Sequence, residues 1–117
     1  MHNNYFESLK SKMDLYAHSV YRVSRMFPKE ETYGVTSQLR RSALSVILNY
    51  IEGFARQRNS VKKNFWEISY GSLKESNYLL LFSLEEKYIS KKDYDEIVIV
   101  SDEIGAMLWK AIKSVIV

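Results

Sequence analysis

Five basic side chains in the middle of the sequence could bind phosphate groups. They are Arg41, Arg56, Arg58, Lys62 and Lys63. Residues 35–66 carry six basic side chains and a single acid, Glu52, whereas residues 67–117 carry six basic and nine acidic side chains. Arginine and lysine bind nucleic-acid phosphates without reading the bases. The uneven charge therefore predicts either contact with RNA or DNA, or a subunit interface at which bands of opposite charge meet.

Asn49, Glu52 and Gly53 lie about one helical turn apart and form a second candidate site. One interpretation is a polar pocket formed by Asn49 and Glu52. The alternative, which we favour, pairs Glu52 with Arg56 at i,i+4 and leaves Gly53 as a point where another helix approaches closely. Arg40 projects into an apolar side of the same segment, where a guanidinium needs a carboxylate or carbonyl oxygens. We expect Arg40 to be structural, with ligand contact as the alternative.

Residues suited to catalysis or metal binding are scarce. The two histidines are His2, near the N-terminus, and His18. His18 has Leu15 three residues before it, not the glutamate that a di-iron bundle requires. The sequence contains no cysteine, Gly-rich phosphate loop or nucleophile elbow. We therefore expect a protein that is not an enzyme and that binds no metal or cofactor.

Four amphipathic segments must position these residues. The apolar residues of the first segment are spaced three and four apart, as in a helical seam: Phe6, Leu9, Met13, Tyr16, Val20, Val23 and Phe27. Pro28 prevents this helix from continuing. We predict helices at about 5–27, 36–56, 61–87 and 91–117, in a single domain that spans 1–117. Long helices with short polar connections predict an all-α, antiparallel up-down-up-down four-helix bundle.

The third and fourth segments have seams of their own. The fourth repeats the spacing at Tyr94, Ile97, Ser101, Ile104, Leu108, Ala111 and Val115. For the third we predict core positions at Phe65, Ile68, Ser72, Leu79 and Phe82. Ser60 and Ser90 are the expected N-caps of these two helices. Gly71 and Ser72 are small, and we expect them to permit a close helix crossing.

The segment 36–56 has more apolar surface than one bundle core requires. At about 100° per residue, its buried arc contains Leu39, Ala43, Val46 and Tyr50. Further apolar residues extend this arc to nearly half the helix: Leu44, Ile47, Ile51 and Phe54. A core-facing stripe needs little more than about 100°. We therefore predict that Leu44, Ile47 and Ile51 contact another subunit of a homo-oligomer.

Composition agrees with a helical protein. One proline and four glycines among 117 residues leave little material for the turns of a sheet. No apolar run approaches the roughly 20 residues of a membrane span, and the N-terminal residues show no apolar signal region. We therefore expect a cytoplasmic protein that has no contact with a membrane.

The segment from Phe27 to Gly53 resembles the signature of the 23S rRNA intervening-sequence proteins, a family of small four-helix bundles. The matching residues are Phe27-Pro28, Glu31, Tyr33-Gly34, Thr36-Ser37-Gln38-Leu39-Arg40-Arg41, Ala43, Ser45, Asn49 and Glu52-Gly53. The likeness extends from about Phe6 to Ile116. It implies an antiparallel bundle assembled as a ring-shaped homopentamer. The family usually has proline where this sequence has Ile47, so we expect a straighter second helix and an altered subunit contact.

Two functions follow from these observations. The first is a non-enzymatic, oligomeric protein that associates with RNA or DNA through phosphates without reading sequence. The second is a structural or protein-interaction module, such as the accessory protein that a related subgroup supplies to the reverse transcriptase of a retroelement. In the first case Arg41, Arg56, Arg58, Lys62 and Lys63 are the contacts, and in the second the partner is a protein.

Overall fold

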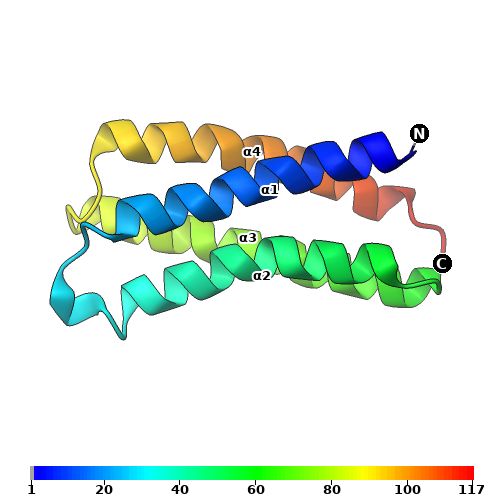
Figure 1. Ribbon diagram of the computed structural model, residues 1–117, viewed down its shortest axis with the longest axis horizontal. Helices are drawn as coiled ribbons and strands as arrows, with labels where there is room; N and C mark the ends of the chain where they lie inside the picture. Colours follow the sequence, from blue (N-terminus) through cyan, green and yellow to red (C-terminus); the bar gives the residue numbers. More distant parts are fainter. Residues whose placement is uncertain (1) are drawn as a thin grey trace.

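The computed structural model describes residues 2–117, with side chains from residue 4 onward. Its elements are α1 (His2–Ser24), the short 3-10 helix η1 (Lys29–Glu31), α2 (Val35–Ala55), α3 (Asn59–Glu85) and α4 (Lys91–Ser114). Consecutive long helices run antiparallel, and α4 packs beside α1 to close a bundle 43 Å long (Figure 1). No strand occurs among the described residues. The predicted all-α class with four long helices is therefore confirmed.

All four long helices end earlier than the sequence predicts, α1 and α4 by three residues each. α1 ends at Ser24, and residues 25–27 form a turn in which the Phe27 N–H donates to the Ser24 carbonyl oxygen at 3.1 Å. Pro28 causes this because the residue before a proline is disfavoured in the α conformation. α4 ends at Ser114, where the backbone of Val115 becomes extended.

Of the two N-caps predicted from the sequence, one is confirmed. Ser90 caps α4, since its Oγ accepts the Asp93 N–H at 3.1 Å. α3 instead begins at Asn59, so Ser60 lies inside the helix and no side chain caps the first turn. The prediction of Ser60 as a cap is wrong because the helix begins at Asn59, two residues before the predicted start at 61.

The predicted seams of α1 and α4 form most of the core. All seven seam residues of the first segment, from Phe6 to Phe27, are 8% exposed or less. The middle five positions of the α4 seam are also buried, while Tyr94 and Val115 at its ends are partly buried. Each large apolar side chain that is fully buried contributes about 1.5–3 kcal/mol to stability. These two helices therefore supply much of the driving force for folding.

The predicted core face of α3 is correct at Leu79 and displaced by one residue at the other four positions. Its buried positions are Trp66, Ser69, Leu73, Ser76, Leu79, Leu80 and Ser83. Ile68, predicted to be buried, is 43% exposed. Serine tolerates these core positions because its hydroxyl bonds to a main-chain carbonyl: Ser69 donates to Val46 at 2.6 Å and Ser83 to Leu79 at 2.8 Å. The prediction followed the large apolar side chains of Phe65, Ile68 and Phe82 and therefore misplaced the face.

α2 and α3 make the most extensive contact in the bundle. Small side chains at their interface allow this, and at one point a glycine is required. A Cβ on Gly53 would lie 2.5 Å from Cδ1 of Trp66 and 3.0 Å from the carbonyl oxygen of Lys62. The expectation that another helix approaches Gly53 closely is therefore confirmed. The same expectation for Gly71 is wrong, because nothing lies within 4 Å of its Cβ position.

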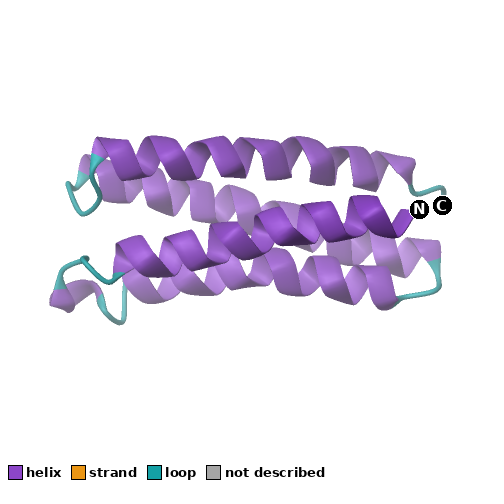
Figure 2. Ribbon diagram, turned by 45° about the horizontal axis from the view of Figure 1, so that its top comes forward, coloured by secondary structure: helices purple, strands orange, loops and turns teal. Residues whose placement is uncertain are grey.

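One end of the bundle gathers the two ends of the chain and the α2–α3 connection (Figures 1 and 2). The opposite end holds η1 and the α3–α4 connection. The first turns of α1 and the last turns of α4 are therefore neighbours of residues 55–59. Within residues 2–117, none of the helices combines the length and the hydrophobicity that a membrane span needs.

Candidate nucleic-acid interface

The α2–α3 connection carries four of the five predicted phosphate-binding residues. Arg56 and Arg58 lie between the helices, and Lys62 and Lys63 follow in the first turns of α3. Among the described side chains, three of these four residues make no ion pair: Arg58, Lys62 and Lys63. We call these three residues the basic turn. Its charges remain available to an external anion.

Arg56 already has an acidic partner within the protein. Its guanidinium pairs with the Glu52 carboxylate, which is the expected i,i+4 ion pair. It also lies 5.3 Å from the centre of the Phe65 ring. Pairs of this kind, at side chains almost half exposed, are worth no more than about 1 kcal/mol. A phosphate could therefore compete for Arg56, but with less gain than at the basic turn.

Lys62 is held above two aromatic rings. Its Nζ lies 5.3 Å from the centre of the Phe54 ring and 5.4 Å from that of Trp66. The ammonium group donates to the Phe54 carbonyl oxygen at 3.4 Å. Attraction to the ring faces holds the cation at the end of the bundle without neutralising its charge. Lys62 therefore joins the basic turn to an aromatic surface.

Arg41 does not join this cluster. It lies near the start of α2, about 22 Å from Arg56 at about 1.5 Å per residue along the helix. Its side chain is exposed beside a groove between α2 and α3. The sequence grouped Arg41 with the other four basic residues because all five lie in the basic stretch 35–66, but the length of α2 separates them in space. A phosphate bound by the basic turn is out of reach of Arg41.

Arg40 packs against the end of α1. Its Nε donates to the Ser24 hydroxyl at 2.8 Å, and an Nη donates to the Tyr21 carbonyl oxygen at 3.5 Å. The guanidinium also lies 4.6 Å from the centre of the Tyr21 ring. These contacts satisfy one of the unpaired carbonyl groups that a helix C-terminus leaves. The geometry favours the structural role, with a hydroxyl and a carbonyl in place of a carboxylate.

Asn49 and Glu52 do not form a shared polar pocket. The Asn49 amide donates to the carbonyl and the hydroxyl of Ser45, both at 2.9 Å. Ser45 in turn bonds to the Ser72 hydroxyl at 2.7 Å, which links α2 to α3. Glu52 is engaged with Arg56. These polar groups therefore stabilise the α2–α3 pair.

The outer face of α2 exposes a band of apolar side chains. Leu44 is 37% exposed and Ile51 40%, so these two predicted interface residues are accessible. Ile47, the third, is partly buried and packs against the core of its own bundle. Leu48, which the prediction omitted, is 60% exposed. Ile68 of α3 is 43% exposed and lies one helical turn before Ser72, which bonds to Ser45 of α2, so it adds to the band. We call Leu44, Leu48, Ile51 and Ile68 the outer apolar band.

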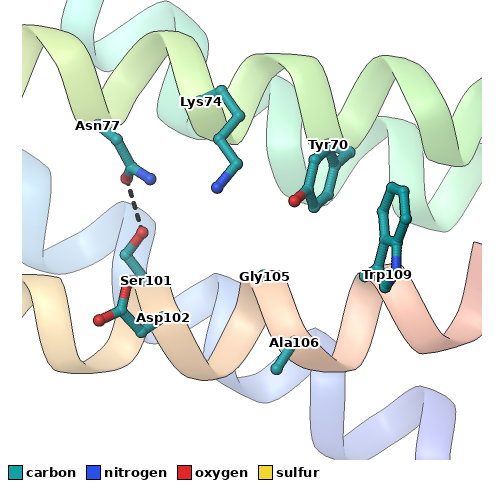
Figure 3. A pocket seen from close by; sticks show the side chains of 8 residues that line it. All are labelled: Tyr70, Lys74, Asn77, Ser101, Asp102, Gly105, Ala106 and Trp109. Carbon is teal, nitrogen blue, oxygen red and sulfur yellow. Dashed lines mark hydrogen bonds between the residues drawn. The ribbon is translucent and has the colours of Figure 1, made fainter.

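A cleft of about 310 Å³ between α3 and α4 is polar (Figure 3). Asn77 and Lys74 of α3 extend into it, and Tyr70 packs on Trp109 with ring centres 5.4 Å apart. The Asn77 Oδ1 accepts the Ser101 hydroxyl at 2.6 Å. It also accepts the buried hydroxyl of Tyr16, from α1, at 3.3 Å. This network ties three helices together.

Burial governs the ionisation of Tyr16. Removal from water disfavours the phenolate and raises the pKa of Tyr16 to about 12, although its hydrogen bond with Ser76 acts in the opposite direction. The hydroxyl therefore stays protonated at neutral pH. It can donate to Asn77 and keep the network intact.

His18 lies on the surface of α1, with its Nε2 3.4 Å from the Asp14 carboxylate. The side chain of His2 lies outside the described residues. In the part of the chain that the structure describes, no three side chains of metal-binding type come together.

Sequence reasoning missed Lys110, which belongs to the same end of the bundle as Lys62. The two lysines line one cleft, together with Tyr5, Phe54 and Trp66. A signal was present in the predicted topology, because an antiparallel bundle must place the end of its fourth helix beside the start of its third. Spacing along one helix could not reveal it.

The fold and this cationic end define a small four-helix bundle protein with a cluster of basic side chains at one end. The sequence matches the profile of the family described as 23S rRNA-intervening sequence protein over residues 7–110, and the chain belongs to this family. Its structure is similar to that of a protein with unknown function from the S23 ribosomal protein family of Bacteroides thetaiotaomicron VPI-5482. The TM-score is 0.86 at 23% sequence identity, over 94% of this chain and 99% of the other, which establishes a shared fold. No curated protein matches the sequence.

Proposed function

We propose that this protein is a non-enzymatic, oligomeric, cytoplasmic bundle that associates with nucleic acid through phosphate contacts and does not read sequence. One observation carries the proposal. Arg58, Lys62 and Lys63 share one turn at the end of the bundle, and among the described side chains none of them has an acidic partner. Lys110 of α4 adds a further cation to this end.

The binding energy comes from counterion release. The cationic side chains of the basic turn displace the counterions that surround the phosphates of a nucleic acid, which favours association at low salt. The contacts involve flexible ammonium and guanidinium groups at a helix end. Charge contacts of this kind neutralise phosphates and carry no sequence information. We therefore expect similar affinity for different sequences.

Oligomerisation would strengthen this weak contact. The outer apolar band exposes four aliphatic side chains that a second copy could cover. In a ring-shaped oligomer, with the pentamer as our proposal, the basic turns would lie on one surface and bind together. Avidity would then raise the affinity without any new contact.

A matched pair of charge variants tests the proposal. The first variant replaces Arg56, Arg58, Lys62 and Lys63 by Ser. The control replaces four basic residues of the opposite end by Ser: Lys29, Lys87, Lys91 and Lys92. Both lose the same formal charge, so a difference between them reports position and not net charge. We expect the first variant to lose most of its affinity for structured RNA or duplex DNA, with unchanged oligomer mass, and the control to keep it.

The outer apolar band also supports the second function, a module that binds another protein, such as an accessory protein of a reverse transcriptase. Exposed apolar surface of this kind marks interaction sites. The two functions separate in the same experiment. If the unmodified protein shifts neither RNA nor duplex DNA at low salt, nucleic-acid association is wrong and the protein-interaction module takes its place.

A further inference from the structure

An aromatic cleft opens at the same end of the bundle as the basic turn. It lies between the first turns of α1, the last turns of α2 and α4 and the start of α3, and its volume is about 480 Å³. This falls within the range of about 300–1,000 Å³ typical of small-molecule pockets. Tyr5, Phe6, Phe54 and Trp66 supply its aromatic lining, and Lys62 and Lys110 its charges. We call it the end cleft.

The rings of the end cleft are fixed by contacts inside the protein. Phe6 and Phe54 are stacked with ring centres 3.8 Å apart. The Trp66 indole N–H donates to the Tyr50 carbonyl oxygen at 3.0 Å, and the Tyr5 hydroxyl donates to the Met107 carbonyl oxygen at 2.7 Å. Because these polar atoms are already satisfied, the rings offer apolar faces. Tyr5 and Phe54 are each 38% exposed, so a flat ligand can reach these two rings, whereas Phe6 and Trp66 are buried, at 8% and 7% exposure.

The charges of the end cleft select an anion. Lys62 and Lys110 line it, no acidic side chain does, and neither lysine makes an ion pair among the side chains that the structure describes. Lys62 belongs to the basic turn and also lies over the rings of Phe54 and Trp66. A ligand that fits must therefore join a flat apolar ring to a negative group a short distance away.

We propose that the end cleft binds one unpaired nucleobase of a single-stranded segment, with the adjoining phosphate held by Lys62 and Lys110. Bases stack on aromatic side chains whatever their identity, because every base has a π face. A base inside a duplex is stacked and paired, and cannot enter. The inference rests on the proposed association with nucleic acid and deepens it, since it assigns a preference for unpaired strands over duplex.

The test uses the fluorescence of Trp66 in a Trp109→Phe background. Trp109 packs on Tyr70 outside the end cleft, so the substitution removes the second indole and leaves the site intact. Four probes are compared: a short single-stranded RNA, an RNA of equal length with abasic sugars, a blunt duplex, and a free nucleoside monophosphate. The abasic strand keeps the phosphates and lacks only the bases.

We expect the single strand to quench Trp66 and to bind roughly 5- to 100-fold more tightly than the abasic strand, the factor associated with stacking one base. Phe54→Ala should reduce affinity for the single strand to that for the abasic strand and leave duplex binding unchanged. Lys110 is exposed, so Lys110→Gln should not disturb folding. This variant should also weaken binding of the single strand. The control Tyr78→Ala removes an exposed ring of α3 outside the cleft and should change nothing.

Three results overturn the inference. Equal affinity for the single strand and the abasic strand would show that no base enters the cleft, while phosphate association would stand. Equal affinity for the nucleoside monophosphate and the single strand would make the cleft a nucleotide site, not a strand site. If no probe binds at low salt, the proposed function fails together with this inference.

Discussion

The same substitution at two glycines should have opposite effects on stability. Gly53 of α2 and Gly71 of α3 both lie inside helices. A Cβ at Gly53 would lie 2.5 Å from Cδ1 and 2.6 Å from Nε1 of Trp66, whereas a Cβ at Gly71 has nothing within 4 Å. Trp66 is 7% exposed and its indole N–H is bonded to Tyr50, so it cannot move aside without loss.

The expected magnitudes follow from these contacts. Replacement of glycine by alanine inside a helix stabilises by about 1 kcal/mol through backbone entropy, and this gain is common to both sites. At Gly53 the added methyl overpacks the α2–α3 interface, at a cost of about 1–3 kcal/mol. Displacement of Trp66 also weakens its hydrogen bond, at about 1 kcal/mol. We therefore expect Gly71→Ala to be more stable than Gly53→Ala by about 2–4 kcal/mol.

Urea unfolding followed by far-UV circular dichroism measures the difference. The two midpoints should fall on either side of the unmodified protein, with Gly53→Ala lower and Gly71→Ala higher, at equal slopes. Trp66 fluorescence should change in the first variant alone. Equal midpoints for the two variants would refute the assignment of Gly53 as the point of close helix approach.

Three further predictions address the subunit contact, Arg40 and Tyr16. Leu48→Lys in the outer apolar band should lower the mass measured by light scattering toward the 13.8 kDa of one chain while the helix content stays the same. The control Leu15→Lys on α1, where Leu15 is 54% exposed, should leave the mass unchanged. An unchanged mass for Leu48→Lys would exclude this face as the subunit contact. Arg40→Met keeps the aliphatic stem and should lower the free energy of unfolding in urea by about 1–2 kcal/mol, because it removes the hydrogen bonds at the end of α1 and the contact with the Tyr21 ring. Unchanged stability would favour the ligand role for Arg40. Tyr16 has a pKa of about 12 in the folded protein, against 10.0 for an exposed tyrosine. Between these two pH values the unfolded state loses a proton that the folded state keeps. The free energy of unfolding should therefore fall by up to about 1.4 kcal/mol per pH unit as pH rises. Tyr16→Phe should flatten this decline, and an equal decline in both proteins would contradict it.

Helical periodicity predicted the parts of the fold in which apolar side chains fill the core. The α1 seam from Phe6 to Phe27 is buried at every position because each residue is large and apolar. The same reasoning failed in α3, where Ser69, Ser76 and Ser83 occupy core positions. A buried serine is stable only where a carbonyl oxygen accepts its hydroxyl. Whether such a carbonyl is in reach depends on the neighbouring helix or on the local turn, which the spacing of apolar residues does not show.

The candidate site was predictable only within a short stretch of chain. The basic turn was found because Arg58, Lys62 and Lys63 are close in sequence and therefore close in space. Arg41 was grouped with them because it lies in the same basic stretch, residues 35–66, although helix rise separates it from the turn. Lys110 was missed because its nearness to Lys62 depends on how four helices pack.

The salt dependence of RNA binding tests the proposed function most directly. The measurement is the affinity of the unmodified protein for a structured RNA across a series of salt concentrations. Phosphate contact predicts that log affinity falls linearly with log salt, by about 0.9 per contacted duplex phosphate, or roughly 3 for the three cations of one basic turn. Absence of binding at low salt, or binding that salt does not weaken, would contradict association through phosphates.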